Sequence, residues 1–193
     1  GQVQKIFGLL TMNGSLQTKG LRTAKKFTMK KPQIILKNWL EQYSILKKCK
    51  MHTYRTGFQG REQLIEVLKK SNLNQKVALA LHSAAETFGV KNSNLETLEL
   101  YMLESGIKVQ LEKILGLEPQ EKGYEVLLIQ PYYKSMLNAS IKSSKINEPE
   151  SNILFNSPPL LTFLDLYHFP LRGREQAEFM AERMSILKRI YKK

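Results

Sequence analysis

The chain has 193 residues, of which 42% are hydrophobic and 24% charged, a composition close to that of average globular proteins. It therefore excludes a fibrous or wholly disordered chain and predicts one compact domain, or one domain with a small module. No apolar stretch approaches the roughly 20 residues that span a bilayer, and the first residues lack the apolar run of a secretory signal. With Cys49 as its single cysteine, the protein is expected to be cytoplasmic, without a membrane partner.

The net charge of +13 is concentrated in the first third of the chain. Residues 1–61 contain 13 basic residues and one acid, Glu41, a net of +12, whereas residues 62–193 carry a net of only +1. A one-sided field of this kind attracts polyanions, and nucleic acid is the commonest such partner. The alternatives are an anionic lipid surface, an acidic protein, or a basic surface that only keeps the protein soluble.

The first 31 residues predict a helix followed by a hairpin. Apolar residues recur at helical spacing over residues 2–12, and Asn13-Gly14 ends that helix. Two short strands, over residues 15–18 and 22–29, then flank a turn at Lys19-Gly20. A helix followed by a basic hairpin is the second half of a winged helix-turn-helix, namely its recognition helix and its wing.

Residues 32–193 predict short helices that alternate with short strands, which is an α+β pattern. Helices are expected at residues 32–46, 61–71, 83–88 and 107–115, and strands at residues 49–55, 77–81, 95–103 and 124–129. The strand at 49–55 is expected at a sheet edge, and the polar residues 138–151 predict a loop. Ser157 is expected to cap the helix that follows it, and a last helix is expected from Arg172.

Two stretches near the C-terminus carry a recognisable pattern. Residues 156–167 read Asn-Ser-Pro-Pro-Leu-Leu-Thr-Phe-Leu-Asp-Leu-Tyr, and residues 170–178 read Pro-Leu-Arg-Gly-Arg-Glu-Gln-Ala-Glu. Together they resemble the C-terminal signature of AbiEi-type antitoxins, a Ser-Pro-x-x-Leu-x-x-x-Asp-Leu-like helix followed by a Pro-x-Arg-Gly-x-Glu-x-Ala-Glu-like helix. Upstream, the helix with Trp39 resembles the linker helix of that family, and Ser83-Ala84-Ala85 resembles its small-residue central helix.

The resemblance implies a transcriptional autoregulator with a winged helix-turn-helix in residues 1–31 and an α+β antitoxin-like domain in residues 32–193. It implies binding to inverted repeats in double-stranded operator DNA. It also implies that the protein counteracts a nucleotidyltransferase toxin in a type IV toxin–antitoxin or abortive-infection (phage defence) pair. Family members begin with a complete winged helix, so we expect this chain, which starts at Gly1, to be a truncated form. Its oligomeric state is left open between a monomer and a weak dimer.

Seven residues are candidates for contact with DNA. Gln2, Gln4 and Lys5 lie on the predicted recognition helix, where Gln can pair with adenine and Lys can approach guanine acceptors. The cations of the wing are expected to contact phosphates without reading sequence. These wing candidates are Lys19, Arg22, Lys25 and Lys26. The alternative is a solvated hairpin beside an ordinary surface helix.

The densest polar cluster lies around the expected junction of the last two long helices. Its members are Asp165, His168, Arg172, Arg174 and Glu175. An enzyme would use Asp165 or Glu175 as a base and His168 as an acid, with the arginines on phosphate. The preferred interpretation is structural, with Glu175 in the first turn of a helix and both arginines paired with Asp165. A toxin-contact surface through Arg172, Arg174 and Glu175 is the functional alternative.

No catalytic residue, metal site or cofactor is predicted, so the protein is not expected to be an enzyme. Cys49 and the histidines lack zinc-ligand spacing, and the glycine-rich phosphate and dinucleotide fingerprints are missing from the sequence. His82, Ser83 and Glu86 supply triad-like residue types without a Gly-x-Ser-x-Gly elbow. The competing hypotheses are a DNA-binding regulator, a nucleic-acid-processing enzyme that uses the cluster around Asp165 and Glu175, and a basic adaptor protein.

Overall fold

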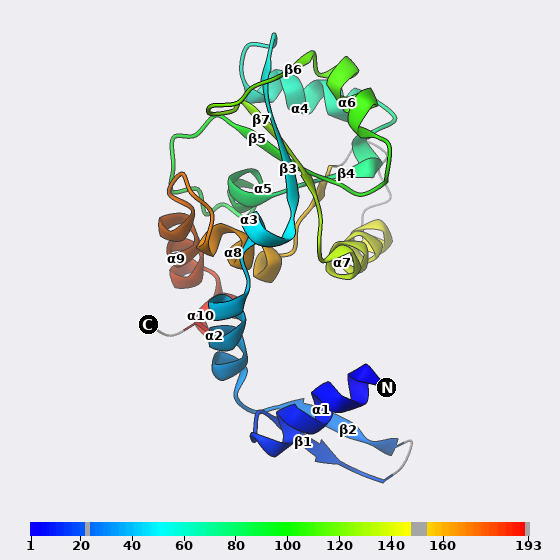
Figure 1. The fold of residues 1–193 in the computed structure, drawn as a ribbon, viewed down its shortest axis with the longest axis vertical. Coiled ribbons are helices and arrows are strands. Elements are labelled where there is room, and N and C mark those ends of the chain that lie inside the picture. Colours follow the sequence, from blue (N-terminus) through cyan, green and yellow to red (C-terminus); the bar gives the residue numbers. More distant parts are fainter. Residues whose placement is uncertain (22–23, 148–153, 192–193) are drawn as a thin grey trace.

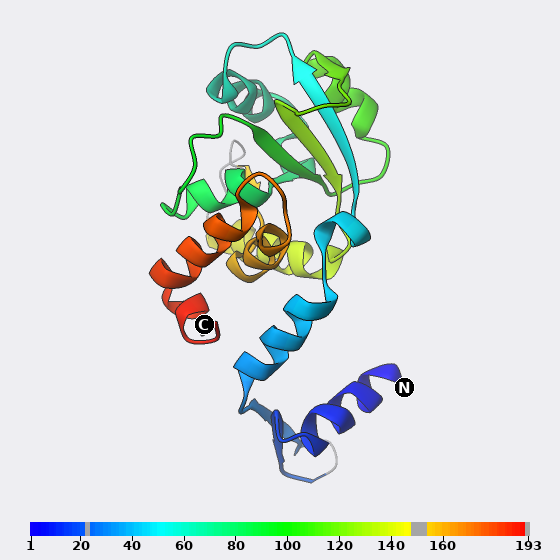
Figure 2. The same ribbon diagram turned by 60° about the vertical axis from the view of Figure 1, so that its left-hand side comes forward.

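The computed structural model describes residues 1–21, 24–147 and 154–191 of the chain. Figure 1 shows a larger unit around a twisted sheet and a smaller unit at the N-terminus, joined by α2. The smaller unit and the joining helix consist of α1 (Gln2–Met12), β1 (Leu16–Lys19), β2 (Lys26–Met29) and α2 (Pro32–Gln42). The smaller unit projects away from the sheet in both views (Figures 1 and 2).

The larger unit alternates short helices and strands, which confirms the predicted α+β class. Its helices are α3 (Ile45–Lys48), α4 (Arg61–Lys70), α5 (Leu81–Thr87), α6 (Lys108–Ile114), α7 (Lys134–Asn147), α8 (Pro159–Tyr167), α9 (Gly173–Arg183) and α10 (Ser185–Lys188), with a 3-10 turn, η2, at Asn74–Lys76. Its strands are β3 (Lys50–Thr56), β4 (Val77–Leu79), β5 (Leu98–Met102), β6 (Leu117–Pro119), β7 (Val126–Gln130) and β8 (Phe155–Asn156).

Within the described residues these strands form one mixed sheet in the order β6-β3-β7-β5-β4-β8. β5 and β7 run parallel, as do β4 and β8, and the other neighbours are antiparallel. Successive side chains of a strand point to opposite faces, so in β7 Leu127 and Ile129 enter one core while Val126 and Leu128 enter another. The first core also holds residues of α2, α5, α8 and α9, and the second holds residues of α4 and α6. The sheet is therefore a middle layer between two groups of helices.

The smaller unit has the predicted helix and the predicted two strands. The rings of Phe7 in α1 and Phe27 in β2 stack, with centroids 4.6 Å apart. None of the residues of α1, all of which the structure describes, is buried. Leu9 and Met12 are 64% and 86% exposed. The helix and the hairpin are thus confirmed as elements, whereas their origin as part of a winged helix stays a prediction.

The loop expected at 138–151 is wrong over residues 138–147, because α7 is a helix there. Tyr133, Leu137 and Ile141 recur four residues apart and pack on the first core, with Leu137 only 1% exposed. This apolar stripe stabilises the helix although serine, lysine and asparagine dominate its sequence. The remaining residues of the predicted loop, 148–151, lie outside the described residues.

The single helix expected at 32–46 is interrupted after Gln42. Tyr43 has an extended backbone (φ −95°, ψ 137°), and the chain re-enters a helix only at Ile45. The side chains of Tyr43 and Ile45 are both buried, at 3% and 0% exposure. Tertiary contacts of these two side chains therefore override the helical periodicity that predicted one continuous helix.

Two further expectations about strands and caps are wrong. β3 does not lie at an edge, because it pairs with β7 on one side and with the unpredicted β6 on the other. Pro158, and not Ser157, is the N-cap of α8, and its side chain makes no capping hydrogen bond. The backbone N–H of Ser157 instead donates to the carbonyl oxygen of Leu79 (2.9 Å) and extends the β4–β8 ladder.

Two observations bear on membranes and metals. None of the helices in the described part of the chain combines the length and the apolar character needed to cross a bilayer. Among the same residues, histidine, cysteine and acidic side chains nowhere gather in a group of three that could hold a metal ion.

Candidate nucleic-acid interface

The helix candidates for DNA contact lie in the first two turns of α1. Gln2, Gln4 and Lys5 are all exposed. At about 100° of rotation per residue, Lys5 points almost opposite to Phe7, which packs on the hairpin, and the two glutamines flank Lys5. Gln4 is partly engaged, because its Oε1 accepts a hydrogen bond from the amino group of Gly1 (3.0 Å). Gln2 and Lys5 therefore lie on the outer half of the helix, whereas Gln4 lies nearer to the side of Phe7.

The same outer half of α1 is partly apolar, which the periodicity analysis did not emphasise. Leu9 and Met12 are exposed on it, and Ile6 is 51% exposed beside them. A helix that reads base edges offers mainly polar side chains to the groove. The polar contact surface of α1 is thus confined to its first turns, around Gln2 and Lys5.

The hairpin brings the wing cations together. Lys19 and Lys26 are direct partners in the β1–β2 register, and Lys25 precedes Lys26 in the chain. All three are exposed, and within the described residues none of them has an acidic partner within ion-pair distance. Like charges directly opposite one another destabilise a strand pair unless an anion lies nearby. The fourth wing candidate, Arg22, lies outside the described residues.

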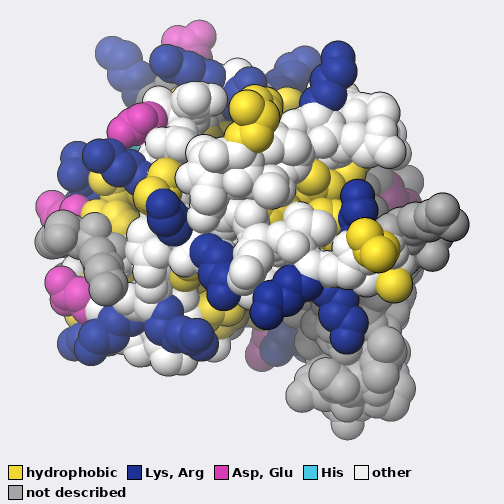
Figure 3. All heavy atoms as spheres, turned by 90° about the horizontal axis from the view of Figure 1, so that it is seen from below, with side chains coloured by type: hydrophobic (Ala, Val, Ile, Leu, Met, Phe, Trp, Pro, Cys, Tyr) yellow, Lys and Arg dark blue, Asp and Glu magenta, His cyan; other side chains and the backbone are white. Residues whose placement is uncertain are grey.

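Basic side chains continue from the hairpin toward the larger unit. Lys30, Lys31 and Lys37, which follow the hairpin into α2, are exposed. Figure 3 shows the molecule from below, with Lys and Arg side chains through the middle of the view and Asp and Glu mostly toward its margins. The excess of positive charge in the sequence is therefore also a spatial excess on this side.

The polar residues at the start of α9 form local ion pairs. Arg172 pairs with Glu175 (2.9 Å), and Arg174 pairs with Glu178 (3.3 Å). Arg174 also lies over the ring of Tyr167, 5.0 Å from its centroid. The expected pairing of Arg172 and Arg174 with Asp165 is therefore wrong, whereas Glu175 does lie in the first turn of the helix.

Asp165 lies in the core, away from those arginines. Its side chain is fully buried, and its carboxylate accepts hydrogen bonds from the hydroxyls of Tyr43 and Tyr101. Burial raises the pKa of Asp165 from 3.8 to about 7, while the two hydroxyls act in the lowering direction. The same burial raises the pKa of the nearby Cys49 to about 11. Asp165 thus anchors the break after α2 to α8 and to β5.

The acidic cluster does not assemble into a catalytic site. Asp165 is enclosed, whereas Glu175 is exposed on α9 and bonded to Arg172. His168 Nε2 lies 2.6 Å from the carbonyl oxygen of Leu40, a contact between α2 and the end of α8. Neither of the two candidate bases, Asp165 and Glu175, therefore lines the groove that His168 and Arg174 line.

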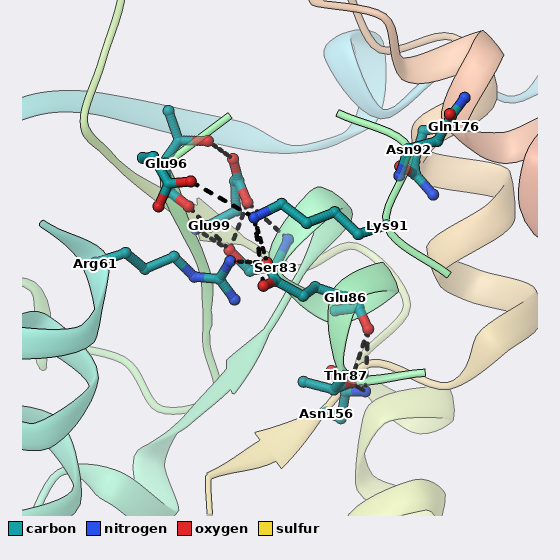
Figure 4. A network of polar contacts seen from close by, with 12 residues as sticks. Arg61, Ser83, Glu86, Thr87, Lys91, Asn92, Glu96, Glu99, Asn156 and Gln176 are labelled. Atoms are coloured by element: carbon teal, nitrogen blue, oxygen red, sulfur yellow. Dashed lines mark hydrogen bonds and ion pairs between the residues drawn. The ribbon is translucent and has the colours of Figure 1, made fainter. Parts of the chain in front are cut away.

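The triad-like residues of α5 belong to separate contacts. Ser83 Oγ donates to Glu99 (2.6 Å), and Glu86 pairs with Arg61 and with Lys91 (3.3 Å to the latter), as Figure 4 shows. His82 packs toward the ring of Phe169, and burial is the largest cause of its lowered pKa. This network ties α5 to α4 and β5. In the sequence, the acidic Glu99 in the middle of an apolar strand is the feature that indicates a buried polar contact here.

A groove of 670 Å³ runs between α2 and the C-terminal helices. Ile34 and Leu40 of α2 line one side, and Tyr167, Arg174 and Tyr191 line the other. Because Arg174 lines this groove, the exposed charges at the start of α9 lie beside a partly apolar surface.

Comparison with known proteins gives one match. A family model described as "Transcriptional regulator, AbiEi antitoxin, Type IV TA system" matches residues 28–186. No curated protein and no solved structure matches the chain. The match covers the end of the hairpin, α2 and the larger unit as far as the start of α10, and it includes both C-terminal stretches of the predicted signature. The chain therefore belongs to the AbiEi antitoxin family of transcriptional regulators from type IV toxin–antitoxin systems.

Proposed function

We propose that this protein is a DNA-binding autoregulator that represses its own promoter by occupying inverted repeats in operator DNA. In this proposal residues 1–31 form a partial winged helix-turn-helix and residues 32–193 form the antitoxin domain. No bond is made or broken, so the protein acts without catalysis and without a cofactor. Family membership supports the role of regulator, and the charge of the small unit supports its orientation toward DNA.

The facing pair of Lys19 and Lys26 carries the proposal. Two unpaired cations across a hairpin repel each other in isolation, and a phosphate between them turns that repulsion into attraction. Arg22 and Lys25 lie between these two lysines in the sequence. The wing would then contact the phosphates of the DNA backbone, while Gln2, Gln4 and Lys5 approach base edges.

The salt dependence of binding tests the wing. Neutralising Lys19, Arg22, Lys25 and Lys26 to Gln is expected to reduce the slope of log affinity against log salt by roughly 3–4, because each cation at a phosphate releases about one counterion. The ligand is a duplex from the gene's own promoter, and fluorescence anisotropy at several salt concentrations gives the slope. The matched control neutralises four exposed lysines of the larger unit, Lys69, Lys70, Lys113 and Lys122.

An unchanged slope in the wing variant would remove the hairpin from the interface. If the slope fell equally in the wing and control variants, the salt dependence would reflect the net charge of the protein and not a contact by the wing. Retention on heparin without binding to any duplex would favour the basic adaptor instead.

We further propose that the protein counteracts a nucleotidyltransferase toxin and contacts it through Arg172, Arg174 and Glu175. The side chains of all three are more than half exposed, at 58%, 67% and 59%, and Arg174 also lines the groove beside α2. Exposed charges beside an apolar hollow are the composition of a protein interface, with a polar rim around a hydrophobic centre.

Co-expression with the toxin encoded beside the gene tests this surface. Changing Arg172, Arg174 and Glu175 to Ala is expected to abolish growth rescue and to weaken a pull-down of the toxin. The control changes Glu66, Lys69 and Lys70 of α4 to Ala, which removes the same number of charges of each sign. Full rescue by the α9 variant would place the toxin contact elsewhere.

A further inference from the structure

A pocket lined by lysines lies at one end of the sheet, in the larger unit. Its volume is 280 Å³, and Lys50, Lys108, Lys134 and His52 line it together with Glu104. These cations come from three separate elements, β3, α6 and α7. The pocket therefore gathers positive charge that is far apart in the sequence.

The topology of the sheet explains why a pocket forms here. β5 and β7 are parallel neighbours, and their carboxyl ends, Met102 and Gln130, both line the pocket. The helix after β5, α6, packs into the second core through Leu111, whereas the helix after β7, α7, packs into the first core through Leu137. The two connections thus leave toward opposite faces of the sheet (Figure 1). Between parallel strands whose connections diverge in this way, α/β proteins bind ligands.

The charge in the pocket is poorly compensated. Lys108 pairs with Glu112 (3.3 Å), and Glu104 pairs with Lys76 (3.3 Å) on the rim. Lys50 and Lys134 have no acidic partner within ion-pair distance in the part of the chain that the structure describes. The pKa of His52 is lowered first by burial and then by Lys108 and Lys50, against a smaller opposing effect of Glu112. Lys50 and Lys108 therefore both act electrostatically on His52, in the wall of the pocket.

We propose that this pocket binds the phosphate group of a small phosphorylated molecule, with Lys50, Lys108 and Lys134 as its cationic ligands. The volume is just below the range of roughly 300–1,000 Å³ typical of sites for whole organic ligands, so it suits a phosphate or diphosphate moiety. Met102 is the main apolar side chain in the lining, which holds no Phe, Tyr or Trp for a base to stack on, and the one ring in it, that of His52, lies beside Lys50 and Lys108. Recognition therefore rests on the phosphate. A local hollow at the strand ends also differs from the extended track along which a nucleic-acid backbone binds.

Calorimetric titration of the full chain with inorganic pyrophosphate at constant ionic strength tests the site. One-site binding is expected, and the Lys50→Met/Lys134→Met variant is expected to bind at least tenfold more weakly. Both lysines are exposed, so the fold is retained, and circular dichroism checks this. The control variant, Lys69→Met/Lys113→Met, removes two exposed lysines outside the pocket and is expected to bind like the parent.

The pKa of His52, followed by NMR, gives an independent measurement. An anion beside the imidazole offsets the field of Lys50 and Lys108, so saturation with pyrophosphate is expected to raise that pKa. Sulfate at equal ionic strength serves as the comparison anion and is expected to bind more weakly.

Three outcomes would overturn the proposal. They are the absence of saturable heat with pyrophosphate, equal weakening in the pocket and control variants, and a pKa of His52 that pyrophosphate leaves unchanged. Loss of duplex-DNA affinity in the pocket variant without any pyrophosphate binding would also overturn it, because the lysines would then belong to a nucleic-acid surface. The proposal does not depend on the wing, since the wing variant retains the pocket.

Discussion

Asp165 is a residue at which burial and hydrogen bonding oppose each other. Burial raises its pKa from 3.8 to about 7 although Tyr43 and Tyr101 donate to the carboxylate. Between those two values the folded state binds more protons than the unfolded state. The contribution of Asp165 to the free energy of unfolding is therefore fully present below pH 3.8 and is lost as the pH rises through about 7. The total loss is at most about 4 kcal/mol, at about 1.4 kcal/mol per pKa unit.

The Asp165→Asn variant has no proton to lose, so this part of the pH dependence is expected to disappear. Urea unfolding of both proteins between pH 4.5 and 8 measures it as the difference between two curves. As the pH falls through about 7, the parent should gain stability relative to the variant. Parallel curves would show that Asp165 does not titrate within this window.

At Gly173, close packing dictates the residue type. A Cβ at this position would lie 2.4 Å from the backbone oxygen of Leu166 and 2.8 Å from Cβ of Phe169. The glycine between Arg172 and Arg174 is therefore required by the close approach of α9 to the end of α8. Gly173→Ala is expected to lower the free energy of unfolding by about 1–3 kcal/mol through overpacking. Gly57→Ala, which has open space around it, is the control and should change stability little by comparison.

Among the elements, α1 is held to the rest of the protein by few buried contacts. Its inward side meets the hairpin through the stacked rings of Phe7 and Phe27, and none of its residues, all described, is buried. Phe7→Ala is expected to detach α1 and to accelerate hydrogen exchange of the β1 and β2 amides by tenfold or more. The midpoint of thermal unfolding of the larger unit should stay unchanged. Leu9→Ala, on the exposed side, is the control, and equal effects of the two changes would contradict this packing.

Elements defined by local periodicity were predictable, and those defined by distant partners were not. The helix over residues 2–12 follows from apolar spacing and from Asn13-Gly14 at its end, and the hairpin follows from the turn at Lys19-Gly20. By contrast, β6 is three residues long and is stabilised by pairing with β3, whose position away from the sheet edge depends on that same pairing. The apolar stripe of α7 is visible in the sequence, but the many polar residues around it favoured the prediction of a loop.

The candidate sites divide in the same way. The exposure of the wing lysines could be anticipated from a run of cations without acids. The partners of Asp165 could not, because Tyr43 and Tyr101 lie 122 and 64 residues away in the chain. The lysine pocket likewise depends on which strand ends the fold brings together, which no spacing in the sequence records.

At the scale of the whole molecule, two proposed surfaces lie on different units. The wing belongs to the hairpin, and the proposed toxin contact belongs to α9 in the larger unit (Figure 1). Between them, α2 is fixed to the larger unit by the hydrogen bond from Trp39 Nε1 to the hydroxyl of Tyr133 (3.0 Å) and by the one from Gln33 to the carbonyl oxygen of Arg189 (3.0 Å). Changes at distant sites that share no partners usually act independently.

Repression and toxin neutralisation are therefore expected to be separable. The variant with four neutralised wing cations should lose operator binding and still rescue growth, whereas the Arg172, Arg174 and Glu175 variant should do the reverse. A promoter–reporter assay and toxin co-expression, each run on both variants and on their combination, test this. If the wing variant also failed to rescue, neutralisation would act through the operator rather than through α9. If the α9 variant derepressed the promoter, the larger unit would take part in DNA binding, and the division of labour between the two units would be wrong.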